Sequence, residues 1–368
     1  IQLRELPTDT TDPTALLGSF AEFDPDADVD LLVGAAQGDW LLWDFEREAL
    51  VDAAAKGEAA RQASYRAVRE RLRLAATLTY FEVIQRRERL DVIDATLALV
   101  ERELADAELR LEAGRTVQAD VLGLRARRAQ VEAERATVEG AHLSARARLG
   151  ELVDLDPMAM GEPDPATEIP DAPWAALEEV RARARAQRHE VVARTLATGA
   201  AGDRIRAAGR QRLPRLVASA RAETLVPEFE FDRDDTSTRF VLGLRWSLFE
   251  GGGISADVDR ERANARRVDA EARSTVLQVD RESIEAWTGR TAARRRLEAA
   301  RLQREAAQEA YRIVSLRYGE GRDTLTRLLE AERALTDART QEVRARAAAE
   351  AAEARLRWAG VLPLTAGS

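Results

Sequence analysis

The chain is organised by apolar positions that recur at gaps of three and four residues from Leu90 to Leu111 and, after one interruption, keep a helical register from Val117 to Leu149. Such gaps are the spacing of a coiled-coil seam. The seam positions are Leu90, Ile93, Leu97, Val100, Leu104, Ala107 and Leu111 before the interruption, and Val117, Val121, Leu124, Val131, Val138, Ala145 and Leu149 after it. Gly114 stands between the two sets, and glycine commonly ends a helix because it adopts the left-handed backbone without a Cβ penalty. The pattern predicts a long helical hairpin over residues 48–150 with its tip near 114–119.

The same pattern recurs 207 residues later, which is the separation of Gly114 from Gly321. The shift places the seam of the first stretch on apolar or small residues: Leu90 on Leu297, Leu104 on Tyr311, Ala107 on Val314, Leu111 on Tyr318, Leu124 on Ala331, Val131 on Ala338, Val138 on Ala345 and Ala145 on Ala352. A repeat of this length indicates a duplicated unit. We therefore predict two structural repeats, with a second long hairpin over residues 251–360 and its tip near 319–323.

Between the hairpins the pattern is not uniform. Residues 151–173 are rich in proline and are predicted to be an extended linker, while residues 174–213 hold a helix from Trp174 to Gln211. Residues 214–250 are predicted to form a pair of β-strands, Leu216 to Val226 and Phe240 to Phe249. In the second strand one face is apolar and comprises Phe240, Leu242, Leu244, Trp246 and Leu248. This alternation is typical both of a strand in a membrane barrel and of an edge strand in a soluble sheet.

Residues 1–47 are predicted to form an irregular N-terminal segment followed by the first β-strands. The stretch from Val29 to Phe45 has two apolar runs around the sequence Gln-Gly-Asp, and this pattern predicts a short β-hairpin with its turn at residues 37–39. Residues 361–368 form a C-terminal tail. The predicted fold is therefore mainly α, with a small β portion.

The helix that follows the first tip carries a second stripe of mostly small residues. Its members are Ala126, Ala129, Ala133, Ala136, Gly140, Leu143 and Ala147. Two stripes on one helix imply two neighbouring helices, and a wall of such helices must close on itself. This predicts a ring-shaped homo-oligomer. A long four-helix bundle within one chain is the alternative.

Composition narrows the function. Charged residues make up 33% of the 368 residues, and the formal charge of −9 argues against nucleic-acid binding, which needs clustered positive surface. The sequence has no cysteine and no apolar run of about 18 residues, so it predicts no disulfide, thiolate metal site or transmembrane helix. Its two histidines, His142 and His189, stand on helices without ligand-spaced partners. We expect no catalytic group, no metal site and no cofactor, so the protein is not predicted to be an enzyme.

With these elements in place, the chain resembles the TolC-like outer-membrane efflux protein family from about Asp39 to Leu362. The motifs that carry the resemblance are LRLEAGRTVQADVLGLRARRAQ and LRYGEGRDTLTRLLEAERALTDA at the tips, QRHEVV to LPRL before a strand, and RWSLFEGG after it. The resemblance implies a homotrimer that shares one outer-membrane β-barrel, to which each chain gives four strands, and one periplasmic α-barrel tube. It further implies a passive exit duct of a tripartite efflux pump or a type I secretion system. The implied partners are a periplasmic adaptor, an inner-membrane transporter and outer-membrane lipid.

The resemblance also implies roles for residues at the tips. Asp120 and Tyr318 match an aspartate and a tyrosine that link neighbouring hairpins at the entrance gate, so we expect a polar link between them. Asp323 stands where the family has a gate arginine, Arg327 stands where it has an entrance aspartate, and Glu330 remains acidic one turn further on. We expect Arg327 to pair with Asp323 and Glu330. Gly114 and Gly321 mark the tips, where the adaptor is expected to dock.

One departure from the family keeps a second interpretation open. The second repeat has a helix before its first strand, and about forty residues that would supply its counterpart in the first repeat have no match. Either residues before Ile1 are missing or the first repeat is degenerate, and this puts the four-strand count in question. The alternative function is a soluble periplasmic coiled-coil scaffold that has lost a working barrel. A barrel would aggregate without detergent, whereas a scaffold would not.

Overall fold

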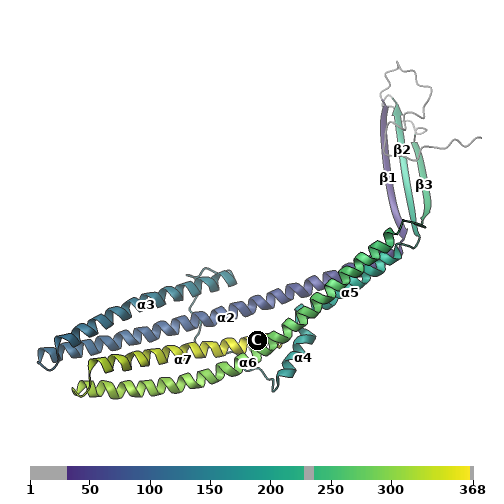
Figure 1. The fold of residues 1–368 in the computed structure, drawn as a ribbon. Coiled ribbons are helices and arrows are strands. Elements are labelled where there is room, and N and C mark those ends of the chain that lie inside the picture. The colour runs from purple at the N-terminus through teal and green to yellow at the C-terminus, as the bar shows by residue number, and fades with distance from the viewer. Residues whose placement is uncertain (1–30, 228–235, 365–368) are drawn as a thin grey trace, which may run out of the picture. The chain divides into compact units, whose positions relative to one another are not determined.

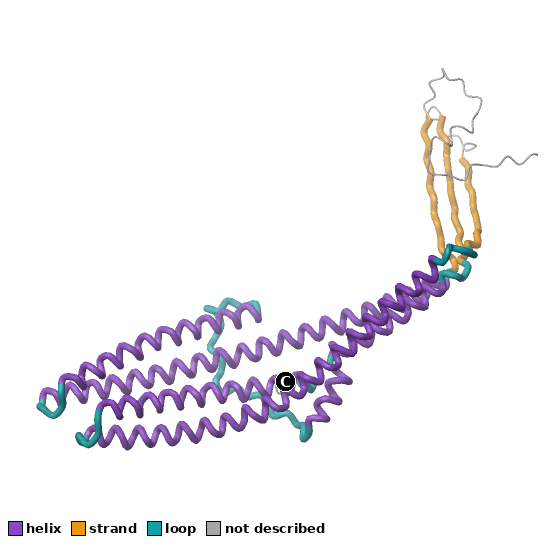
Figure 2. Tube along the Cα trace, in the orientation of Figure 1, coloured by secondary structure: helices purple, strands orange, loops and turns teal. Residues whose placement is uncertain are grey.

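The structure is a computed structural model that describes residues 31–227 and 236–364, and it is mainly helical (Figures 1 and 2). Its elements are β1 (Leu31–Trp43), α2 (Phe45–Glu112), α3 (Gln118–Val153), α4 (Leu177–Gln187), α5 (His189–Arg210), β2 (Arg215–Pro227), β3 (Thr236–Arg245), α6 (Gly253–Gly319) and α7 (Leu325–Ala359). The chain divides into a sheet unit, residues 31–50 and 206–258, and a helical unit, residues 51–205 and 259–364. The predicted mainly-α class is confirmed.

The helical unit contains the two hairpins that the apolar period predicts. In the first, α2 and α3 pack through a buried seam that includes Leu90, Ile93, Val131 and Val138. In the second, α6 and α7 follow each other around a tip of the same kind (Figure 1). At 1.5 Å per residue, the 68 residues of α2 extend for roughly 100 Å. Over the described ranges, no helix is both long enough and apolar enough to cross a membrane.

The two hairpins also pack against each other near their tips. Leu325 and Leu329 of α7 join an apolar cluster that is otherwise formed by the first hairpin, whose buried members are Leu104, Ala107, Val121 and Leu124. Gly123 of α3 makes this approach possible, because a Cβ atom there would lie 2.9 Å from Cδ2 of Leu325. The seam residues of each hairpin therefore serve two contacts, one within the hairpin and one between hairpins.

In the sheet unit the described strands form an antiparallel sheet in the order β1-β2-β3. The β-hairpin predicted between Val29 and Phe45 is wrong, because β1 is a single strand of 13 residues that pairs with β2 along its length. Gly38 is not a turn residue. A Cβ atom at Gly38 would lie 2.8 Å from the indole ring of Trp40, so the glycine leaves room for that ring on the same face.

The register extends the predicted alternation to all three strands. Trp40 pairs with Ala218 and Ala218 with Leu242, so these residues share an apolar face. The opposite face carries polar residues, as in the row formed by Gln37, Arg221 and Arg239. The sheet therefore has one mostly apolar side and one mixed side, which carries these polar residues together with apolar ones such as Leu41 and Val217.

The linker between the repeats is held against the end of α7 by hydrogen bonds between its backbone and side chains of that helix. The carboxylates of Glu350 and Glu353 accept hydrogen bonds from the backbone N–H groups of Ile169 (2.7 Å) and Ala172 (2.6 Å). Arg357 donates to the carbonyl oxygen of Pro170 at 2.9 Å. These bonds satisfy backbone groups that an extended segment cannot pair within itself. The linker therefore has a defined path across the helices.

Candidate functional site

The tips of the two hairpins have the same backbone geometry. In the first, Gly114 adopts a φ of 66°, its N–H donates to the carbonyl of Leu111 (2.9 Å), and Arg115 N–H donates to Arg110 (2.8 Å). In the second, Gly321 adopts a φ of 71°. Its two bonds match those of the first tip: Gly321 N–H to Tyr318 at 3.0 Å and Arg322 N–H to Arg317 at 2.8 Å. Both pairs form the Schellman motif, which needs a left-handed residue at the glycine position.

Polar side chains lie where each tip leads into the next helix. Thr116 donates a hydrogen bond to the carboxylate of Asp120 at 2.8 Å, just inside the start of α3. At the start of α7, Thr324 is the N-cap, and its hydroxyl accepts a bond from the N–H of Arg327 at 3.4 Å. The carboxylate of Asp323 accepts a bond from the N–H of Thr324 at 2.9 Å. Asp120 and Asp323 are therefore held in place by their own tips.

Tyr318 is buried beside the first tip. The guanidinium carbon of Arg110 lies 5.3 Å from the centre of the Tyr318 ring, a distance typical of a cation–π contact. Burial raises the pKa of the Tyr318 hydroxyl, and the negative charge of Asp120 raises it further. In the described part of the chain this hydroxyl has no hydrogen-bond partner. The expected link between Asp120 and Tyr318 is therefore not a direct hydrogen bond within one chain.

The remaining predicted entrance residues differ in exposure. The side chain of Arg327 is exposed, and its Nε atom lies 4.0 Å from the nearly buried carboxylate of Asp323. Glu330 is exposed, and no ion pair joins it to Arg327 among the residues that the structure describes. The helix start thus brings Arg327 to Asp323 but leaves Glu330 to solvent.

The predicted apolar residues of the second strand are all exposed, from 55% at Trp246 to 79% at Phe240. Phe240, Leu242 and Leu244 lie on β3, but the strand ends at Arg245, four residues before the predicted end. Trp246 and Leu248 lie beyond it, because the chain leaves the sheet where the indole N–H of Trp246 donates to the carbonyl of Arg212 (3.0 Å). An exposed apolar strand face needs a partner other than water.

A buried ion pair between the hairpins was missed at the sequence level. Arg127 of α3 donates two hydrogen bonds to Glu332 of α7, at 2.8 and 2.9 Å, and both side chains are less than a tenth exposed. One signal could have revealed the pair. The seam jumps from Leu124 to Val131, and the position that it skips is occupied by Arg127.

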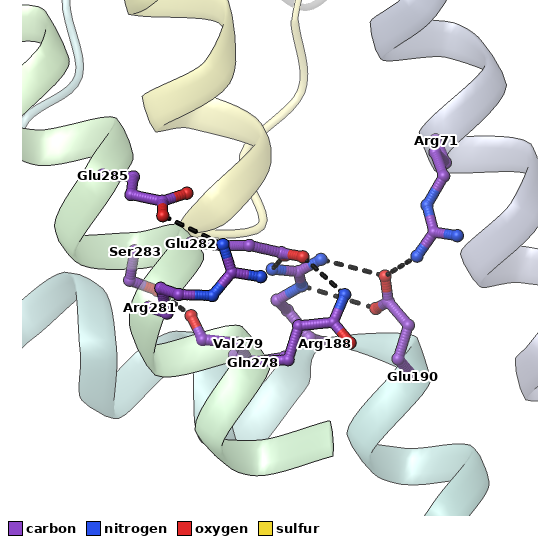
Figure 3. Close-up of polar contacts among 9 residues, drawn as sticks. All are labelled: Arg71, Arg188, Glu190, Gln278, Val279, Arg281, Glu282, Ser283 and Glu285. Atoms are coloured by element: carbon purple, nitrogen blue, oxygen red, sulfur yellow. Dashed lines mark hydrogen bonds and ion pairs between the residues drawn. The ribbon is translucent and has the colours of Figure 1, made fainter. Parts of the chain in front are cut away.

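A second buried cluster, around Arg188, was also missed (Figure 3). The predicted helix from Trp174 to Gln211 breaks into α4 and α5 at Arg188, whose backbone is extended with ψ of 130°. Its buried guanidinium donates to Glu190 (2.9 Å) and Glu282 (2.5 Å), and it lies 4.0 Å from the ring centre of Trp358. Glu190 in turn pairs with Arg71 of α2 at 3.4 Å. One side chain thus joins α5, α6 and α7, and reaches α2 through Glu190.

The described residues show no arrangement of three or more histidine, aspartate and glutamate side chains that could hold a metal ion. His142 is buried on α3, and its Nε2 atom lies 3.4 Å from the carboxylate of Glu162.

Comparison with known proteins finds a family model that matches part of the chain and solved structures with a similar fold. The family model of the outer membrane efflux protein matches residues 180–359, from within α4 to the end of α7. The fold is similar to that of the outer membrane protein VceC from Vibrio cholerae, with 20% identity, a TM-score of 0.75, and coverage of 92% of this chain and 88% of that one.

Two further solved structures have the same fold. For a membrane protein from Pseudomonas aeruginosa the identity is 20% and the TM-score 0.76, over 90% of this chain and 83% of that one. For the open state of the MtrE outer membrane channel of Neisseria gonorrhoeae the identity is 19% and the TM-score 0.72, over 91% of this chain and 81% of that one. No curated protein matches the sequence. At these identities the likeness to solved structures concerns the fold.

Proposed function

The chain carries an outer membrane efflux protein domain over residues 180–359, and from this premise we propose that it forms the exit channel of an export pump. The channel conducts small molecules or proteins passively from the periplasm outward and is not an enzyme. The observation that carries the proposal is that the first hairpin, which lies outside the matched residues, has the same tip geometry as the second. Two equivalent hairpins per chain are what a tube built from repeats requires.

We place the protein in the outer membrane, with its helical unit in the periplasm. The apolar side of the sheet, with Trp40, Phe240, Leu242 and Leu244, faces lipid, and the mixed side faces a water-filled lumen. Three chains close the ring, because the small-residue stripe of α3 offers a second helix-packing surface. A periplasmic adaptor docks at the tips around Gly114 and Gly321, and an inner-membrane transporter supplies the energy.

The test uses two arginine substitutions on neighbouring positions of β3. Leu242→Arg lies on the side assigned to lipid, where an arginine costs about 2–4 kcal/mol at mid-membrane. Val241→Arg lies on the other side and serves as the control. We expect the purified wild-type protein and Val241→Arg to be trimers in detergent and to conduct in planar bilayers, while Leu242→Arg fails to insert. Equal insertion of both variants would refute the assignment of the sides.

A wild-type protein that is monodisperse without detergent and never conducts would favour the soluble scaffold over the channel. The apolar side of the sheet would then be covered by protein instead of lipid. The distinction is clear because an uncovered apolar band of this size aggregates in water.

We further propose that Asp120, Tyr318, Asp323, Arg327 and Glu330 form the entrance gate. Arg327 is exposed and only loosely paired, so its charge acts mainly on passing ions and contributes little to stability. Arg327→Glu should raise single-channel conductance and cation preference in a planar bilayer. Arg312→Glu, at an exposed helical arginine paired with Glu309, is the control and should leave both unchanged. Unchanged conductance and selectivity in Arg327→Glu would mean that Arg327 does not face the lumen.

A further inference from the structure

Four buried polar residues join the two hairpins at one level, and we call them the interhairpin lock: Thr96 of α2, Arg127 of α3, and Glu332 and Thr336 of α7. Arg127 holds both carboxylate oxygens of Glu332. The Thr336 hydroxyl donates to the same carboxylate at 3.1 Å and lies 2.9 Å from the Thr96 hydroxyl. The Thr96 hydroxyl also donates to the carbonyl oxygen of Val92 at 2.9 Å, and each threonine hydroxyl has only one hydrogen to give. The lock is therefore a connected cluster of buried polar groups around the carboxylate of Glu332.

The bonding of the lock makes it costly to open. All four residues are buried, so separation of the hairpins here would leave a guanidinium and a carboxylate without partners in a site that water reaches poorly. The two charges are also held in a bidentate geometry, which loses both bonds at once if either helix shifts.

Between the lock and the tips the contacts between the hairpins are of a weaker kind. Glu332 lies about three turns of helix from Gly321, a distance of roughly 17 Å. On this stretch the hairpins meet through the apolar contact of Gly123 with Leu325 and through the Tyr311 hydroxyl, which donates to Glu103 at 3.0 Å across half-buried side chains. They also meet through the cation–π contact of Arg110 with Tyr318. The ion pair at the tip itself, Arg327 with Asp323, lies within one hairpin. Apolar contacts can slide or part without leaving a buried charge.

We propose that the interhairpin lock is the fixed point of the entrance, so that the two hairpins of a chain separate only on the tip side of Arg127 and Glu332. The lock thus divides the pair of hairpins into two sections. The hairpins stay joined at the lock, and they can separate between the lock and the tips. The inference rests on the proposed function in that it treats the tips as the entrance of a channel. The division of the hairpin pair can be measured without any conduction.

The first test uses disulfides, which suit this chain because it has no native cysteine. Thr96→Cys with Thr336→Cys bridges the lock, where the hydroxyls already lie 2.9 Å apart. Gly123→Cys with Leu325→Cys bridges the tip side, where a Cβ atom at position 123 would lie 2.9 Å from Cδ2 of Leu325. We expect the oxidised lock bridge to change conductance less than twofold relative to its reduced form, and the oxidised tip bridge to reduce it at least tenfold, reversibly with reductant. An oxidised lock bridge that blocks conduction as strongly as the tip bridge would overturn the proposal.

The second test is independent of conduction. Amide hydrogen exchange in the wild-type protein should show a step at the lock, with residues 100–124 and 311–328 exchanging at least tenfold faster than residues 88–96 and 332–343. Glu332→Gln should erase the step, while Arg128→Gln, at an exposed neighbour of Arg127, should leave it in place. A wild-type protein without the step overturns the inference even if it conducts. A protein with the step that never conducts refutes the channel and leaves the lock intact.

Discussion

Substitution of Arg188 by methionine should loosen the junction of α5, α6 and α7 more than any change at an exposed ion pair. Methionine keeps much of the arginine stem but removes the charge that serves Glu190 and Glu282. Removing one partner of a buried ion pair costs about 3–5 kcal/mol, because the charge that remains is uncompensated. Arg188 is 3% exposed, and the two carboxylates are each about four-fifths buried, so the full range applies.

The assay is amide hydrogen exchange at the start of α5 (residues 189–195) and the end of α7 (352–359), corrected for the intrinsic rate at each pH. A loss of 3–5 kcal/mol corresponds to exchange that is about 150- to 5,000-fold faster at pH 7. Arg281→Met is the control, because Arg281 forms an exposed pair with Glu285 in the same region (Figure 3) and should change exchange by no more than about threefold.

The pH dependence gives a second, sharper criterion. Burial alone would raise the pKa of Glu190, but the hydrogen bond from Arg188 and the charges of Arg188 and Arg71 more than offset it and hold the pKa below its ordinary value. A lowered folded pKa contributes stability above the unfolded pKa, and that contribution is lost as the pH falls through the folded pKa. Without Arg188, burial becomes the main influence on Glu190 and favours its neutral form. Protonation of Glu190 then removes the cost of an unpaired buried charge. The difference in amide exchange rate between wild type and Arg188→Met should therefore become smaller as the pH falls from 7 to about 4. If the two proteins exchanged at the same rate, or if the difference between their rates did not change with pH, the reasoning would be refuted.

Three further predictions concern other parts of the chain. Gly114→Val should strain the left-handed tip by about 1–2 kcal/mol and abolish adaptor binding in pull-down while the sheet unit still folds. Gly57→Val, at a helical position with free space, should bind normally. Burial raises the pKa of Glu103, so its contribution to the α2–α6 contact is present at low pH and is lost as the pH rises through the raised value. Hydrogen exchange at residues 100–107 of the wild-type protein should slow relative to that of Glu103→Gln as the pH falls toward 4.5. The same dependence of exchange on pH in both proteins would contradict this. Glu353→Ala should cost about 3–5 kcal/mol and expose residues 160–176 to limited proteolysis, whereas Glu178→Ala, at an exposed carboxylate, should not.

The hairpins could be predicted from the sequence because their determinants are local. The period of three and four fixes which helix face is buried, and the glycines at 114 and 321 are at the left-handed positions of two identical motifs. The apolar and mixed sides of the sheet were partly predictable for the same reason. Side chains on a strand alternate whatever the partner strand is, so the assignment of Phe240, Leu242 and Leu244 to one side needed no tertiary information.

The features that were not predicted depend on contacts distant in sequence. Gly38 resembles a turn residue, and only the position of the Trp40 ring shows that it is a packing residue within a strand. The break at Arg188 has no proline or glycine to mark it, since it arises from carboxylates on α6 and an indole on α7. Arg127 and Glu332 each look like exposed helical residues, because Glu and Arg pairs are abundant on every helix of this chain. For Arg127, the seam position that it occupies was the available signal.

The fastening of the linker to α7 sets an order on folding. The side chains that hold Ile169, Ala172 and Pro170 lie 181 to 187 residues later in the chain. At synthesis rates of roughly 5–20 residues per second, these anchors emerge about ten seconds or more after the segment they hold. The linker between the repeats thus lacks these bonds while the second repeat is made, and α7 both completes its own hairpin and secures the connection to the first repeat.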